Sequence, residues 1–132
     1  MTIDPNAVRE MAERYAQAWS SGAPEAVAGF YEESGRIVIN DGDPIVGRAA
    51  LTEMAAGFMS AFPGMVVRLD DIRTAGAHAI FVWTLEGRHV ETGKQVRVGG
   101  WEEWRLSEQV LVAESRGRFD AAEYDRQVAE GI

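Results

Sequence analysis

Apolar residues recur at helical spacing in the first half of the chain. Asp4-Pro5 suits the start of a helix, because Asp is a good N-cap and Pro fits the first helical position. The apolar stripe that follows predicts a helix that ends at Gly22; its members are Val8, Met11, Ala12, Tyr15, Ala16 and Trp19. Ala23-Pro24-Glu25 then predicts a short second helix that carries Val27, Phe30 and Tyr31.

The next segment combines a short strand, a turn and a third helix. The β-branched residues 37–39 predict a strand over residues 36–40, and Asp41-Gly42 is a strong turn signal. The third helix is expected from about 48 to 61, and Pro63-Gly64 stops it. Its apolar stripe consists of Leu51, Met54, Ala55, Phe58, Met59 and Phe62.

The second half of the chain alternates in the manner of strands joined by turns. Strands are predicted over residues 65–74, 78–90, 96–106 and 110–119, and Asp120 begins a terminal helix that ends near Gly131. Helices followed by hairpin strands indicate an α+β fold. Three helices on one face of a curved sheet would leave an apolar hollow between the two layers, which is where we expect function.

The strand over residues 96–106 holds the best functional clue. Every second residue faces the same side of a strand. One face is apolar apart from a single carboxyl group; it comprises Val96, Val98, Gly100, Glu102, Trp104 and Leu106. A carboxyl on an apolar face is costly unless it is paired, protonated or open to a cavity. Glu102 is therefore either functional or held structurally by an arginine or a backbone donor.

Composition narrows the classes of function. We treat residues 1–132 as a single domain, large enough to bury its own core. The net charge of −8 argues against nucleic acid or an anionic membrane as a partner. The chain has no cysteine, no bilayer-length apolar run and no secretory signal pattern, so a cytoplasmic protein is the default expectation. With two separated histidines and no cysteine, we expect no metal site.

Several short motifs, taken in order, resemble the nuclear transport factor 2-like superfamily and its SnoaL-like polyketide cyclase branch. They are Tyr15-Ala16-Gln17-Ala18-Trp19, residues 41–48 (DGDPIVGR), residues 83–89 (WTLEGRH), Thr92-Gly93-Lys94 and residues 102–106 (EEWRL). The resemblance spans nearly the whole chain. It implies a cone-shaped, curved mixed sheet with three helices on its concave face and a short C-terminal helix, a roll that encloses a deep pocket. It also implies a homodimer through the sheet, for which the outward-facing Trp101 is a plausible contact.

The same resemblance suggests three catalytic candidates. Glu102 stands where SnoaL-like cyclases carry an acid, typically Asp, and where the similar ketosteroid isomerases carry a protonated acid. His89 matches the histidine that precedes this acid, and Tyr15 matches the isomerase tyrosine that donates to an oxyanion. Each has a plainer interpretation: Tyr15 is a core residue with a polar tip, and His89 is a half-solvated histidine at a strand end.

The isomerase general base, a carboxylate on the first strand, has no counterpart, because Ile37, Val38, Ile39 and Asn40 occupy that region. An apolar pocket lining suited to a small hydrophobic ligand is expected from a set of large apolar residues. The alternative is that these residues simply form the core. These candidate ligand-binding residues are Trp19, Trp83, Trp104, Phe58, Met54, Met59 and Asn40.

Three functions fit these features. The first is a cofactor-independent isomerase, lyase or cyclase in which Glu102 moves a proton beside a carbonyl group and Tyr15 or His89 donates to the enolate oxygen. The second is a non-catalytic protein that binds an apolar metabolite. The third is a dimerising module whose pocket is filled by its own side chains.

Overall fold

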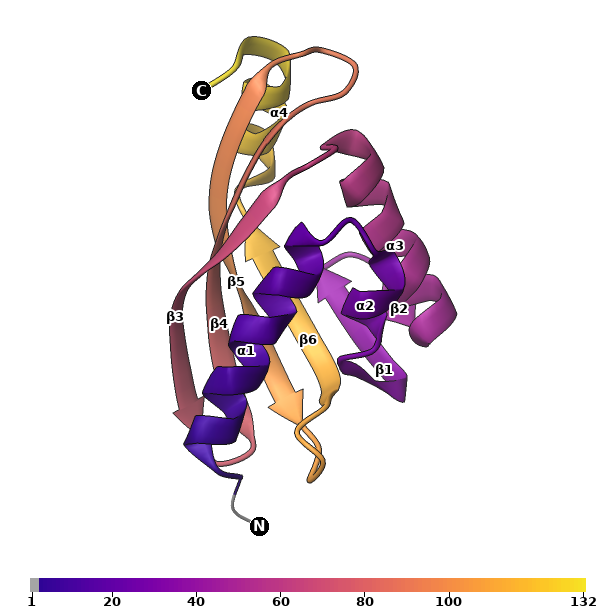
Figure 1. Cartoon of the computed structure of the whole chain (residues 1–132), viewed down its shortest axis with the longest axis vertical. Coiled ribbons are helices and arrows are strands. Elements are labelled where there is room, and N and C mark those ends of the chain that lie inside the picture. The colour runs from indigo at the N-terminus through magenta and orange to yellow at the C-terminus, as the bar shows by residue number, and fades with distance from the viewer. Residues whose placement is uncertain (1–2) are drawn as a thin grey trace.

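The computed structural model describes residues 3–132, which form four helices and a six-stranded sheet (Figure 1). The helices are α1 (Pro5–Ser20), α2 (Pro24–Ala28), α3 (Arg48–Ala61) and α4 (Ala121–Glu130). The strands are β1 (Tyr31–Ile39), β2 (Ile45–Val46), β3 (Val66–Ala75), β4 (His78–Arg88), β5 (Gln95–Leu106) and β6 (Val112–Phe119). Their order in the sheet is β2-β1-β6-β5-β4-β3. The expected α+β architecture with a curved, mixed sheet is confirmed.

The sheet is mixed because its first and last long strands run parallel. β1 pairs with β6 in parallel, whereas every other neighbouring pair is antiparallel. The guanidinium of Arg48, at the start of α3, donates to the Tyr31 carbonyl at 2.7 and 3.0 Å. This bond fixes the beginning of β1, where the pairing with β6 is irregular between Tyr31 and Arg36.

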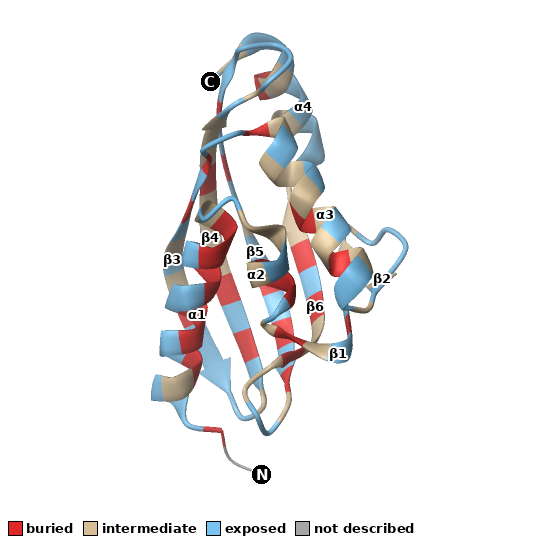
Figure 2. Ribbon diagram, turned by 45° about the vertical axis from the view of Figure 1, so that its right-hand side comes forward, coloured by how far each residue is buried: buried red, intermediate tan, exposed pale blue. Residues whose placement is uncertain are grey.

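The alternation expected for β5 is present in the structure. Its inward side chains are buried, except at the partly exposed Gly100, and the outward ones are exposed (Figure 2). Helix α1 lays its apolar stripe across β3 and β4, α3 packs against α2 and β1, and α4 contacts β5 at the other end of the sheet. The Asp4 side chain caps α1 as expected, by accepting from the Asn6 amide at 2.9 Å. The core therefore lies between α1 to α3 and the inner face of the sheet.

Several predicted boundaries differ from the structure. Tyr31 begins β1 instead of lying in the second helix, which ends at Ala28, and the first strand covers Tyr31–Ile39 instead of residues 36–40. β4 ends at Arg88, because the backbone of His89 exchanges hydrogen bonds with Gly93 and Lys94 in the following turn. The last strand starts at Val112 because Val110 has a φ of 58°, which a strand does not allow. None of the helices formed by residues 3–132 has the length and apolar character needed to cross a bilayer.

Gly100 allows two elements to approach β5 closely. A Cβ atom at this position would lie 2.3 Å from the Arg118 carbonyl oxygen and 2.6 Å from Cζ2 of Trp83. The absence of a side chain thus lets the Trp83 ring lie over the strand.

We predict that Gly100→Ala destabilises the fold by about 1–3 kcal/mol or more, because the backbone carbonyl cannot move away without disturbing the β5–β6 ladder. Urea unfolding measures the change. The matched control is Gly99→Ala, whose Cβ would meet its nearest neighbour at an ordinary 3.5 Å and so should change stability little. Equal stability of the two variants would contradict this account of Gly100.

Candidate functional site

Glu102 lies on the inner face of the sheet and is only 6% exposed. Its strand, β5, is flanked by β4 and β6, and its register partners are Phe81 and Gly117. Gly117 leaves room for the acid, since a Cβ there would lie 3.9 Å from Cγ of Glu102. The carboxyl is therefore held in the middle of the sheet, facing the helices.

Side-chain donors surround this carboxyl. The Trp104 indole donates to Oε1 at 2.9 Å, and the Ser115 hydroxyl donates to Oε1 at 2.8 Å. Both residues face inward, and they are direct partners across β5 and β6. None of the ion pairs among residues 3–132 involves Glu102. The carboxyl is held by neutral side chains, not by an arginine.

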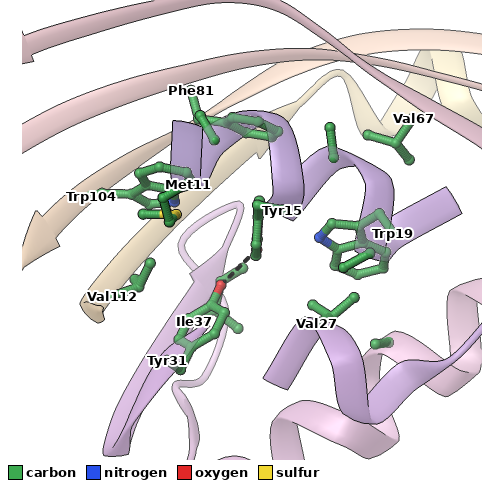
Figure 3. Close-up of a cluster of buried hydrophobic side chains, with 14 of the residues drawn as sticks. Met11, Tyr15, Trp19, Val27, Tyr31, Ile37, Val67, Phe81, Trp104 and Val112 are labelled. Atoms are coloured by element: carbon green, nitrogen blue, oxygen red, sulfur yellow. Dashed lines mark hydrogen bonds between the residues drawn. The ribbon is translucent and has the colours of Figure 1, made fainter. Parts of the chain in front are cut away.

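Two buried tyrosines complete the cluster. The Tyr15 hydroxyl from α1 donates to Oε1 and Oε2 of Glu102, at 3.0 and 3.1 Å. The Tyr31 hydroxyl from β1 lies 2.9 Å from that of Tyr15 (Figure 3). It lies 3.5 Å from Oε1 of Glu102. Because a hydroxyl has one proton to donate, Tyr31 donates to Tyr15 when Tyr15 donates to Glu102. We call Glu102, Tyr15, Tyr31, Trp104 and Ser115 the carboxyl cluster.

The burial of the carboxyl cluster shifts its titration. Desolvation raises the pKa of Glu102, and the bonds from Trp104, Ser115 and the tyrosines oppose this by favouring the ionised form. Burial, reinforced by the charge of Glu102, raises the pKa of both Tyr15 and Tyr31 well above 10.0. The phenols therefore remain neutral donors, and Glu102 is the member whose protonation can change.

An apolar hollow of about 70 Å³ opens beside Glu102. Among the described residues that line it, Glu102 is the only one with a carboxyl group. The lining includes Trp19, Ile37, Ile39, Met54, Phe58, Trp83, Phe119 and Tyr124. Pockets for drug-sized ligands hold about 300–1,000 Å³, so a ligand here is small or extends beyond the enclosed part.

The comparison with known proteins identifies the family. A family model described as a SnoaL-like domain matches residues 12–115. The chain belongs to the SnoaL-like domain family. All five members of the carboxyl cluster lie within the matched segment, whereas α4 lies outside it.

Solved structures confirm the fold of this SnoaL-like domain at low sequence identity. A protein assigned as a SnoaL-like polyketide cyclase from Jannaschia sp. CCS1 is 15% identical, with a TM-score of 0.84 over 100% of this chain and 99% of that one. A protein with a ketosteroid isomerase-like fold from Catenulispora acidiphila DSM 44928, in complex with trimethylamine, is 16% identical, with a TM-score of 0.80 over 87% and 88%. SalBIII, an epoxide hydrolase/cyclase-like enzyme in pyran ring formation in salinomycin, is 15% identical, with a TM-score of 0.80 over 91% and 95%. No curated protein matches the sequence.

The structure brings together only part of the site expected from the sequence. Tyr15 and Glu102 meet, but His89 does not join them. Phe81 is the β4 partner of Glu102, and His89 follows eight residues later, about 26 Å along the strand direction. There the His89 ring packs edge-on against Phe62, and its Nδ1 accepts from the Thr92 amide at 3.3 Å.

Some of the expected ligand-binding residues line the hollow, and the others lie elsewhere. Trp19, Trp83, Phe58 and Met54 line the hollow. Trp104 instead stacks on Phe81 within the core, with ring centroids 5.1 Å apart. Met59 lines a different hollow at the end of α1, and the Asn40 side chain accepts from the Phe119 amide at 3.0 Å.

Sequence reasoning missed Tyr31 and Ser115. The sequence predicts a helix at Tyr31 because the polar run Glu32-Glu33-Ser34 obscures the beginning of β1. Ser115 could have been found from alternation: Arg116 and Arg118 on the last strand place Ser115 and Gly117 on the opposite face.

The raised pKa of Glu102 predicts an unusual pH dependence of stability. Above its ordinary value of 4.5 the unfolded chain loses this proton while the folded chain retains it, so stability falls as the pH rises toward the folded pKa. The loss amounts to about 1.4 kcal/mol for each pH unit between the two pKa values. Urea unfolding from about pH 4 to about pH 8 should show this loss in the wild type relative to Glu102→Gln, which cannot ionise.

Glu103→Gln is the matched control, because Glu103 is the next residue on the strand and faces outward. It should retain the wild-type pH dependence. Parallel stability curves for the wild type and Glu102→Gln would show that the pKa of Glu102 is not raised by folding.

Proposed function

We propose that this SnoaL-like domain is an isomerase, lyase or cyclase that acts on a small apolar carbonyl compound by proton transfer through Glu102. The observation that carries the proposal is a buried carboxyl of raised pKa in the wall of an apolar hollow. An acid whose pKa is raised by burial can donate its proton to a carbonyl oxygen, and the carboxylate left behind can take up the proton that the neighbouring carbon releases.

The aromatic wall suits the apolar part of such a ligand. Trp19 and Phe58 pack edge to face, and Trp83 lies in the same relation to Phe119. Together they offer flat surfaces on two sides of the hollow. In this proposal Tyr15 positions Glu102 instead of touching the ligand, because its hydroxyl is already bonded within the carboxyl cluster.

Proton transfer can be tested before the natural substrate is known. Small cyclic ketones incubated with the protein in D₂O should exchange the hydrogens beside their carbonyl group, as followed by proton NMR. Glu102→Gln should slow this exchange about 10²–10⁴-fold, because it cannot transfer a proton. Glu103→Gln should leave the rate unchanged, and circular dichroism would establish that both variants are folded.

A second function, binding without chemistry, is favoured by a different observation. Ile37 and Ile39 of β1 line the hollow in the region where the similar isomerases carry their general base, so the wall lacks a second carboxyl group. Thermal stabilisation by the same ketones, with no exchange above that of the Glu102→Gln variant, would establish binding and exclude the catalytic proposal.

We also propose that the domain forms a homodimer through the outer face of the sheet. Trp101 of β5 is 41% exposed and pairs with Val82 of β4, and Ile80 is likewise exposed on that strand. Apolar side chains at the centre of a charged sheet face are typical of a contact surface.

Light scattering at micromolar concentration should give the mass of a dimer for the wild type and of a monomer for Trp101→Glu. The charge would be buried unpaired in the interface. The control is Val90→Glu, an exposed apolar position outside the strands, which should remain dimeric. A monomeric wild type would refute the interface.

A further inference from the structure

The two oxygens of Glu102 lie in different surroundings. Oε1 accepts from Ser115 at 2.8 Å, from Trp104 at 2.9 Å and from Tyr15 at 3.0 Å, with the Tyr31 hydroxyl at 3.5 Å. Oε2 has Tyr15, at 3.1 Å, as its hydrogen-bond partner among the described residues. The carboxyl thus has one crowded oxygen and one with spare capacity.

The donors of the crowded oxygen belong to residues outside the wall of the hollow. Ser115 and Trp104 are almost completely buried and are not part of that wall, although Glu102 is. Their bonds to Oε1 therefore lie within the core and do not depend on a ligand in the hollow. Oε2, which neither of them reaches, is the oxygen with lone-pair capacity left for a ligand.

We propose that Ser115 and Trp104 are positioning residues that hold Oε1 and leave Oε2 as the oxygen that exchanges a proton with the ligand. This inference rests on the proposed function of Glu102. In the protonated acid, Oε1 is the carbonyl oxygen, because its acceptor sites are occupied, and Oε2 carries the proton. When the Oε2–H bond breaks, the proton passes to the ligand oxygen, and the charge left on the carboxylate is stabilised by the donors at Oε1. The carboxylate then takes up the proton released by the carbon beside the carbonyl group, so the ligand becomes an enol and the acid is restored.

Both positioning residues are fixed by the sheet. Trp104 and Ser115 face each other across the β5–β6 ladder, and the Trp104 ring is stacked at 13° to that of Phe81. The titratable groups bonded to Glu102 are the phenols of Tyr15, from α1, and Tyr31, from β1, and Arg118 of β6 and Tyr124 of α4 line the same hollow. Removing a donor from Oε1 therefore changes the C=O bond and the pKa of Glu102 without removing a charge from its surroundings.

Infrared spectroscopy of the ligand-free protein tests which oxygen is the carbonyl. The carboxyl C=O band of protonated Glu102 is assigned by its loss in Glu102→Gln. Ser115→Ala should move this band to higher frequency, because a carbonyl that loses a donor has a stronger C=O bond. Trp104→Phe should act in the same direction. The controls are Ser60→Ala, an exposed serine on α3, and Trp101→Phe, the outward tryptophan of the same strand, and neither should move the band.

The pKa of Glu102, followed by carbon NMR of the labelled carboxyl, gives a second readout. Each positioning variant should raise it by about one unit, because a donor that favours the ionised form is lost. An unmoved band and an unchanged pKa in folded Ser115→Ala would overturn the inference, even if Trp104→Phe failed to fold. Neither readout needs a ligand, so the two proposals can fail separately. If Ser115→Ala shifts the band but the wild type does not exchange ketone hydrogens, only the proposed proton transfer to a ligand is overturned.

Discussion

The burial of one carboxyl group constrains the architecture around it. An acid on an apolar sheet face costs several kcal/mol unless its oxygens find donors. Here the donors come from α1, β5 and β6, and β1 supplies Tyr31, which donates to the Tyr15 hydroxyl; these elements are far apart in the sequence. The packing of α1 on the sheet and the parallel pairing of β1 with β6 are what place Tyr15, Tyr31 and Ser115 around Glu102.

The sequence predicted what depends on local pattern. Alternation along residues 96–106 placed Glu102 on the buried face, and the helical stripe of α1 placed Tyr15 in the core. It could not show that Tyr31 reaches the same acid, because that contact requires the first long strand to lie beside the last one. The sequence pattern extended β4 through His89, because the turn that ends the strand is formed by backbone hydrogen bonds, which side-chain alternation does not reveal.

Among the described residues, the ion pairs of the sheet join other charged side chains and not Glu102. Arg36 pairs with Glu114, and the guanidinium of Arg118, a residue that also lines the hollow, pairs with Asp41. The field at Glu102 is therefore set by burial and by neutral donors. Hydrogen bonds of this kind depend steeply on distance and angle. A pKa balanced in this way responds to small movements of α1 or β6, whereas one set by an adjacent arginine would resist them.

A wall with a single carboxyl also limits the chemistry that it can support. Hydrolysis would require a group to activate water in addition to one that protonates the leaving atom, and the apolar wall formed by Ile37 and Ile39 offers no such group. An isomerisation or ring closure through an enol is less demanding, because Glu102 can protonate the carbonyl oxygen and its carboxylate can then take up the proton that the neighbouring carbon releases, which restores the acid. A buried acid that has, among the described residues, three donors at one oxygen and only Tyr15 at the other matches that cycle, since it starts and ends in the protonated state that burial already favours.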